Sequence, residues 1–334
     1  MIDIINDTVN IHLSQVPSFR IKHAIERGNL KRVLMTMFAG IGDQVCAEPT
    51  LRYAVRCRDR GEIDHLGFAS SAPSLYSHLK FDEVITTQYD VNQWFIMDTI
   101  PRVQGLSYEH ISHGLTNCVD ASSLYAFRMQ LPTEDREIRI TPTRPIEVIA
   151  ELFKWKTILV HAGKHWPSKT FPKKWWNDVL FEIRKRGIKP ILIGSNVDGN
   201  RTTVNVDNTG CIDLRGKTDL GELAWVCQRA TVLLSNDSAP IHFAASEDPG
   251  DRENTGLTWI HTLATCKHFD YISHFRKGQW QFREVNYSLG GVWDILGFLP
   301  NKESDVRVDN TDSKLVESWL PDPKEYAEAA LGRL

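Results

Sequence analysis

The chain of 334 residues has few cysteines, no long apolar run and no excess of one charge. Its six cysteines form no Cys-x-x-Cys pair and no zinc-type spacing, which predicts reduced, packed thiols in a cytoplasmic protein. No apolar stretch approaches the length that a bilayer requires, and residues 1–10 lack the basic and apolar blocks of a secretion signal. The net charge of -3 excludes an overall basic field for nucleic acid.

What is present is the composition of a soluble globular protein. Hydrophobic residues make up 42% and charged residues 24% of the chain, and its length suffices for two cores of roughly 150 residues each. Apolar strand-like runs alternate with amphipathic helical segments twice, on either side of the charged, proline-containing stretch 131–145. This pattern predicts an α/β protein with two doubly wound domains over residues 1–145 and 146–300, followed by a helical segment over 301–334.

Residues 231–242, TVLLSNDSAPIH, are the most informative segment. The run 231–234 predicts a buried parallel strand, and small polar residues then lead into a helix that has Pro240 in its first turn. Such a junction presents backbone N–H groups, which favour a phosphate or diphosphate. The same pattern also fits an ordinary strand-loop-helix connection.

In the first half of the chain, strands are predicted over 31–38, 62–69 and 81–85, and in the second half a helix capped by Asp219 is predicted over 219–229. Two further loops follow predicted strands. In the first, a turn over residues 39–42 precedes a helix predicted over 43–58, so that Asp43 is either a helix-capping acid or a functional carboxylate. In the second, a strand over 157–161 precedes the basic segment 168–176, which contains Lys169. That segment is either a solvated basic loop or a source of cations for an anionic ligand. In doubly wound folds, such strand ends face the ligand.

Together the loops resemble a known family, because their motifs occur in its order. The chain contains G-D-x-V-x-x-x-P-x-L-R at 42–52, K-x-F-P-x-x-x-W at 169–176, L-x-G-x-T-x-L-x-E-L-A at 214–224 and N-D-S-A-x-x-H at 236–242. The chain thus resembles glycosyltransferase family 9, the ADP-heptose:lipopolysaccharide heptosyltransferases and their relatives. It departs from the family pattern at Phe171, at Ala239 and after Ser246. The resemblance implies a GT-B fold, in which two Rossmann-like domains face a central cleft and a C-terminal helix packs back across.

The resemblance and the chemistry together imply an inverting, metal-independent transfer of a sugar from a nucleotide-diphosphate sugar to an acceptor hydroxyl. Asp43 is the expected general base, in a domain that takes the acceptor, and Lys169 is the expected cation for the departing diphosphate. No cofactor or metal is expected besides the donor substrate. The expected donor-binding residues, most of them in the second domain, are Gly42, Gly194, Asp198, Asn236, Asp237, Ser238, Ala239 and His242.

Other functions remain open at this point. The acceptor is a surface saccharide of the lipopolysaccharide type or, alternatively, a hydroxymethylated pyrimidine in DNA, for which basic-aromatic runs at 164–166, 173–176 and 267–269 offer a surface. A non-catalytic nucleotide-sugar binding protein is a further alternative. A nucleotide-sugar epimerase would need a different acid-base set, which the sequence does not contain. The sequence carries no signal for the oligomeric state.

Overall fold

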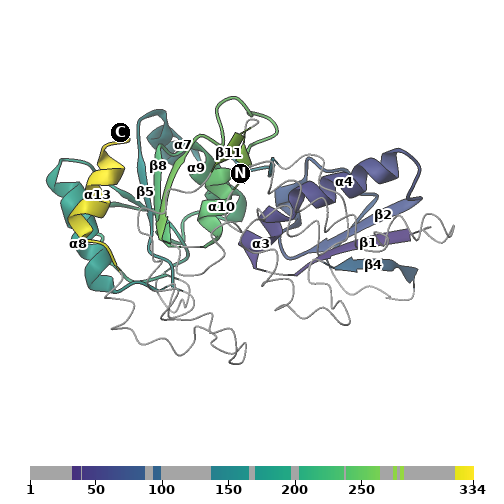
Figure 1. Cartoon of the computed structure of the whole chain (residues 1–334), viewed down its shortest axis with the longest axis horizontal. Coiled ribbons are helices and arrows are strands. Elements are labelled where there is room, and N and C mark those ends of the chain that lie inside the picture. Colours follow the sequence, from purple (N-terminus) through teal and green to yellow (C-terminus); the bar gives the residue numbers. More distant parts are fainter. Residues whose placement is uncertain are drawn as a thin grey trace. The chain divides into compact units, whose positions relative to one another are not determined.

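The computed structural model describes residues 32–38, 40–86, 93–98, 137–164, 170–196, 203–236, 238–263, 274–276, 279–281 and 320–334. The chain divides into two compact units, each described here by itself (Figure 1). Unit 1 comprises Met1–Thr141, Ser246–Arg252 and His268–Phe282, and unit 2 comprises Pro142–Ala245, Glu253–Lys267 and Arg283–Leu334. The segment Ser246–Arg252, hereafter called the excursion, belongs to unit 1, although the chain immediately before and after it belongs to unit 2.

Unit 1 is built on a parallel sheet with the strand order β3-β2-β1-β4. The strands are β1 (Arg32–Met37), β2 (His65–Ser70), β3 (Glu83–Ile85) and β4 (Phe95–Asp98). The predicted strands at 31–38, 62–69 and 81–85 are thereby confirmed in position, within a few residues. Strand β4 was not predicted. A small antiparallel pair, β10 (His274–Arg276) and β11 (Gln279–Gln281), also belongs to unit 1.

Two helices follow β1 where the sequence predicted one. They are α3 (Ile41–Cys46) and α4 (Glu48–Asp59), and the short 3₁₀ helix η1 (Pro73–Tyr76) follows β2. The helix divides at Ala47 because Pro49, in the first turn of α4, has no N–H to donate into a continuous helix. The prediction that Gly42 closes a tight turn was wrong, since α3 begins at Ile41 and includes it.

Unit 2 is built on a parallel sheet with the strand order β7-β6-β5-β8-β9. Its strands are β5 (Ile158–His161), β6 (Ile191–Leu192), β7 (Ile212–Asp213), β8 (Val232–Asn236) and β9 (Trp259–Leu263). Its helices are α7 (Glu147–Ala150), η3 (Glu151–Lys154), α8 (Lys173–Lys185), α9 (Leu220–Arg229), α10 (Ala239–Ala245) and α13 (Pro323–Leu331). Asp219 caps α9 in a reciprocal capping box with Glu222, as the sequence predicted for the cap.

Aromatic side chains form the core of unit 2 where α13 lies against α8 (Figure 1). Trp176, Phe171 and Tyr326 are fully buried there. Two hydrogen bonds fix the contact: Trp175 Nε1 donates to the Pro321 carbonyl at 2.8 Å, and the Tyr326 hydroxyl donates to a backbone carbonyl of β9 at 2.8 Å. The C-terminal helix is thus an integral part of unit 2.

Candidate functional site

Each sheet has a topological switch point, where ligands of doubly wound folds bind. In unit 2 the chain runs outward from β5 to β6 and β7, then returns to place β8 on the other side of β5. In unit 1 it runs from β1 to β2 and β3, then returns to place β4 beside β1. The crevice at the carboxyl ends of such strand pairs is the ordinary ligand site. The predicted loops after β1, β5 and β8 all begin at these ends.

The loop after β8 is held to the end of β5 by His161. The His161 Nδ1 atom lies 3.2 Å from Ser235 Oγ and 3.0 Å from Ser238 Oγ. The Ser235 hydroxyl in turn donates to the Asn236 carbonyl at 2.7 Å. These contacts hold Ser235 and Ser238 beside His161 at the switch point, and residues 235–238 are hereafter called the donor loop. Asp237, one of its residues, lies outside the described part of the chain.

A second contact ties the same two strand ends through Gly163. The Gly163 N–H donates to Asn236 Oδ1 at 3.2 Å. A Cβ atom at Gly163 would collide with Asn236 Oδ1. The absence of a side chain at this position is therefore what allows the loop after β5 to approach the fully buried Asn236.

Gly194, at the end of β6, lies on the other side of His161. Its φ of +125° is a conformation that favours glycine, and a Cβ there would also meet Thr203 Oγ1 at 3.0 Å and the His161 ring at 3.1 Å. Next to it, Ser195 Oγ and Thr203 Oγ1 lie 3.1 Å apart. The predicted donor residues Gly194 and Asn236 therefore both adjoin His161.

The histidine beside the donor loop is neutral. Burial lowers the pKa of His161 from 6.5 to about 4, so that its imidazole carries no charge near neutral pH. Hydroxyl and amide groups surround it. Such groups can donate hydrogen bonds to phosphate oxygens, while the charge of a bound diphosphate has to be matched by a cation from elsewhere.

Helix α10 continues from the donor loop and carries two predicted donor residues. Ala239 is its first residue, and His242 lies within it with a side chain only 5% exposed. The sequence predicted that the dipole of this helix would favour a phosphate. Because α10 has only seven residues, fewer than two turns contribute to that dipole. The hydrogen-bonded strand ends are the stronger indication of a ligand site.

In unit 1, the predicted base lies directly after the switch-point strand. Asp43 is the third residue of α3, where Gly40 occupies the N-cap position, so Asp43 is a first-turn residue and not the cap. Both Asp43 and Gly42 are partly exposed.

Three predicted site residues, Lys169, Asp198 and Asp237, lie outside the described residues. Sequence reasoning also missed one residue that the structure brings into the site: His161. Its signal was its place as the last residue of an otherwise apolar strand run, where a polar side chain reaches the ligand edge of the sheet.

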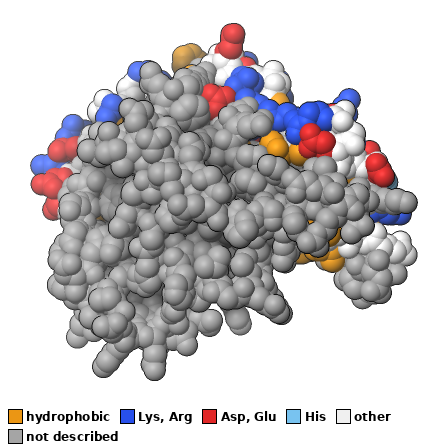
Figure 2. All heavy atoms as spheres, turned by 45° about the vertical axis from the view of Figure 1, so that its right-hand side comes forward, with side chains coloured by type: hydrophobic (Ala, Val, Ile, Leu, Met, Phe, Trp, Pro, Cys, Tyr) orange, Lys and Arg blue, Asp and Glu red, His pale blue; other side chains and the backbone are white. Residues whose placement is uncertain are grey.

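The surface expected for DNA is reduced by the structure. Trp175 and Trp176 were predicted to offer stacking surface, but they are 7% and 0% exposed and form part of the core of unit 2. On the face drawn in Figure 2, the visible described side chains carry Lys, Arg, Asp and Glu interspersed. Within the described ranges, no group of three or more His, Cys, Asp or Glu side chains could hold a metal ion. Nor does that part of the chain contain a helix long and apolar enough to span a membrane.

Comparisons with known proteins agree with this architecture. Residues 126–249 match glycosyltransferase family 9 (heptosyltransferase). A glycosyl transferase of family 9 from Veillonella parvula DSM 2008 superposes with a TM-score of 0.54 at 15% identity, covering 90% of this chain and 98% of that one. A structure of the dodecameric iron-containing heptosyltransferase TibC in complex with ADP-D-beta-D-heptose gives 0.58 at 12% identity, covering 91% and 77%. TibC from enterotoxigenic E. coli H10407 gives 0.54 at 12% identity, covering 91% and 76%.

The fold is therefore the GT-B fold of these glycosyltransferases, with mixed α/β units on parallel sheets. The resemblance to glycosyltransferase family 9 that the motifs predicted is confirmed, and the matched segment contains both β5 and the donor loop. Residues 126–249 are therefore similar to the heptosyltransferases of glycosyltransferase family 9. No curated protein sequence matches the chain.

Proposed function

We propose that the protein transfers a sugar from a nucleotide-diphosphate sugar to an acceptor hydroxyl, with inversion at the anomeric carbon and without a metal ion. The observation that carries the proposal is the hydrogen-bonded cluster of His161, Asn236 and the donor loop at the β5–β8 switch point. This cluster lies in the segment that matches family 9. Neutral hydrogen-bond donors at such a strand edge suit a diphosphate.

In the proposed reaction, Asp43 removes the proton of the acceptor hydroxyl as its oxygen attacks the anomeric carbon. The bond from that carbon to the diphosphate oxygen breaks, and the nucleoside diphosphate leaves with the bonding electrons. Lys169 balances the charge that develops on the leaving group. Gly194, Asn236, Asp237, Ser238, Ala239 and His242 form or support the diphosphate site, Asp198 contacts the ribose or base, and Gly42 leaves room beside Asp43. A single displacement of this kind inverts the anomeric configuration.

The first donor to test is ADP-heptose, because ADP-D-beta-D-heptose is the ligand named in the complex of TibC. A saccharide of the lipopolysaccharide type is the first acceptor. The proposed location is the cytoplasm, which the reduced cysteines Cys57, Cys211 and Cys227 support. DNA carrying a hydroxymethylated pyrimidine is the alternative acceptor, and salt-dependent retardation of such DNA on a gel would favour it.

The test combines binding and turnover. Thermal shift with ADP, UDP, GDP and CDP sugars should select one donor, since a specific ligand stabilises the folded state by mass action. Turnover of that donor should then fall on the order of 10²-fold or more in Lys169→Ala. Lys174→Ala is the matched control, because Lys174 is an exposed lysine of α8 that pairs with Asp178 on the same helix. Binding without turnover for any acceptor would favour the non-catalytic alternative, and full activity of Lys169→Ala would refute its role.

A further inference from the structure

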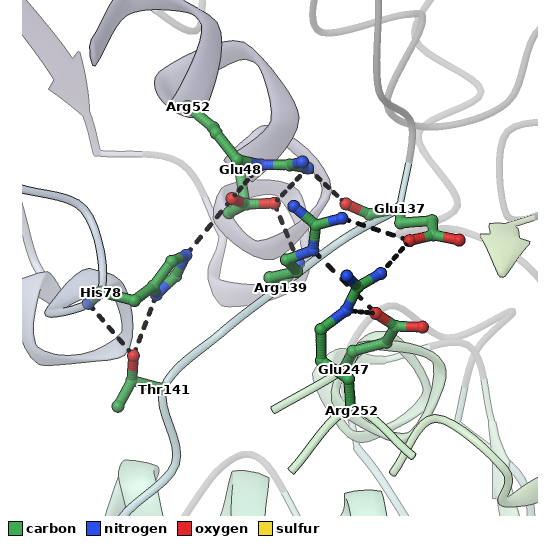
Figure 3. A network of polar contacts seen from close by, with 8 residues as sticks. All are labelled: Glu48, Arg52, His78, Glu137, Arg139, Thr141, Glu247 and Arg252. Carbon is green, nitrogen blue, oxygen red and sulfur yellow. Dashed lines mark hydrogen bonds and ion pairs between the residues drawn. The ribbon is translucent and has the colours of Figure 1, made fainter. Parts of the chain in front are cut away.

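A network of paired charges in unit 1 connects parts of the chain that are distant in sequence (Figure 3). Three carboxylates face three guanidinium groups, so that the formal charges of these six side chains cancel. His78 and Thr141 extend the network at one end. The six charged residues are Glu48, Arg52, Glu137, Arg139, Glu247 and Arg252.

Glu48, the first residue of α4, is fully buried at one side of the network. Its carboxylate accepts hydrogen bonds from Arg52 Nε at 2.9 Å and Nη2 at 3.2 Å, and from the Arg139 backbone N–H at 2.9 Å. His78 Nε2 lies 3.3 Å from the same carboxylate. A buried carboxylate needs this number of partners, and removing them leaves a costly unpaired charge. Glu48 therefore anchors residues 137–141, hereafter the crossing segment, to α4.

Glu247 also binds the crossing segment, as Glu48 does. Its backbone pairs with that segment: the Ile140 N–H donates to the Glu247 carbonyl at 3.0 Å, and the Glu247 N–H donates to the Ile138 carbonyl at 2.9 Å. Its carboxylate, 2% exposed, accepts a hydrogen bond from Arg252 Nε at 2.7 Å. Arg252 also binds the carboxylate of Glu137. The excursion Ser246–Arg252 is thus held on the crossing segment by backbone and ionic contacts together.

Glu48 and Glu247, the two buried glutamates, each follow a helix of the candidate site at the same spacing in the sequence. Helix α3, which carries Asp43, ends at Cys46, and Glu48 follows after a single residue. Helix α10, which follows the donor loop, ends at Ala245, and Glu247 likewise follows after a single residue. The C-terminal ends of both helices therefore lead directly into one ionic network.

We propose that Glu48 and Glu247 are positioning residues that couple the two helices through the crossing segment. Binding of a nucleotide at the donor loop then orders α3 as well as α10, and so brings Asp43 into its working position. The coupling is carried by a contiguous set of hydrogen bonds and ion pairs, as a physical link between sites requires. This inference rests on the proposed function for the roles of the two helices, but the link itself is independent of it.

The test uses Arg252→Ala, because Arg252 is 47% exposed and its loss should not prevent folding. Arg60→Ala is the matched control: Arg60 is 45% exposed, lies in the same unit, and pairs with Glu62 two residues away, outside the network. The melting temperature of both variants establishes that they fold. Hydrogen exchange of the amides in α3 and α10 is then measured by mass spectrometry in the wild type and both variants.

Without nucleotide, Arg252→Ala should speed exchange in both α3 and α10, whereas Arg60→Ala should leave both helices as in the wild type. Saturating ADP should slow exchange of α10 and α3 in the wild type, by up to about 100-fold at a hundred times its dissociation constant. In Arg252→Ala it should slow α10 alone. Faster exchange confined to the excursion, or protection of α3 by ADP that persists in Arg252→Ala, would overturn the proposal.

Turnover provides a readout that a purely structural role would not change. In Arg252→Ala, kcat should fall on the order of 10- to 100-fold through misplacement of Asp43, while KM for the donor stays near that of the wild type. Arg252→Lys, which keeps one charge, should restore part of kcat. A wild type that binds ADP but turns over no sugar would refute the proposed function, and the exchange experiment without nucleotide would still decide the coupling.

Discussion

The donor loop of unit 2 and the ionic network of unit 1 solve the same problem with opposite chemistry. Both hold together segments that are distant in sequence. Around the donor loop the contacts involve a neutral histidine, hydroxyls and an amide. In unit 1 they involve three carboxylates and three guanidinium groups. The difference agrees with the proposal that the donor loop accepts a charged ligand, whereas the ionic network does not.

A site for an anionic diphosphate gains from neutral surroundings, because a built-in carboxylate would repel the ligand and a built-in ion pair would compete with it. The ionic network, which holds segments of the chain together, has the opposite requirement. Paired, buried charges tolerate little displacement, since separating them strands a charge away from water. We therefore expect substitutions in the two regions to affect different quantities.

The largest effect is expected for Asp43→Asn, which alters chemistry and leaves donor binding alone. Asparagine is nearly isosteric, so α3 should keep its structure, but it cannot accept the proton of the acceptor. Turnover should fall by roughly 10²–10⁴-fold while donor affinity, measured by calorimetry, stays near the wild-type value. Asp59→Asn, on the exposed end of α4, is the control. Retained turnover would make Asp43 a structural residue.

The next largest effect is expected on the free energy of unfolding, for a substitution in the ionic network. Glu48→Ala should lower the free energy of unfolding by about 3–5 kcal/mol, because it leaves Arg52 buried beside no carboxylate of its own helix. Urea denaturation measures the change. Glu62→Ala, which removes an exposed partner, should cost no more than about 1 kcal/mol. Replacing both Glu48 and Arg52 by apolar residues should recover part of the loss, and an equal or greater loss would argue against pairing as its cause.

Two buried histidines, His161 beside the donor loop and His261 in β9, should make stability depend on pH. Burial holds the pKa of His161 and of His261 at about 4, below the ordinary 6.5, so the unfolded chain binds more protons than the folded one between these values. Stability is then complete above pH 6.5 and is lost as the pH falls toward 4, on the order of 3 kcal/mol for each histidine. Denaturation across this range tests the sign. His261→Phe should flatten the dependence, and an unchanged slope would contradict the assignment for His261.

The smallest effect is expected from chelation. If Lys169 and neutral hydrogen-bond donors stabilise the leaving group, EDTA should leave turnover unchanged. Loss of activity that magnesium or manganese restores would show that the ligand-accepting region needs an ion, and the contrast between the two regions would then have to be revised.

Much of the fold followed from local patterns. Continuous apolar runs gave β1, β5 and β8, and capping residues gave the start of α9, because these signals depend only on neighbouring residues. Strand β4 escaped prediction, since pairing with β1 stabilises it more than its own short run does. For the site, the strand-end loops were predictable. The contact of Gly163 with Asn236 was not, because it joins residues on different strands.

The same limit applied more strongly to the ionic network. Its members are spread from Glu48 to Arg252, and each residue alone looks like an ordinary surface charge. Only the three-dimensional structure shows that Glu48 is buried and that the backbones of Glu247 and Arg139 pair as in a β-sheet. The charged stretch 131–145 stands out by its composition, which suggested a connection between the two halves of the chain and did not predict the pairing.

The packing of α13 on α8 gives the protein a built-in optical probe. Trp175 and Trp176 have ring centroids 4.9 Å apart, and the ring of Tyr326 from α13 lies 5.0 Å from that of Trp175. Undocking of α13 would admit water to both indole rings, remove the hydrogen bond from Trp175 Nε1 to Pro321 and shift their emission to longer wavelength. The emission of these two indole rings therefore depends on the attachment of the C-terminal helix.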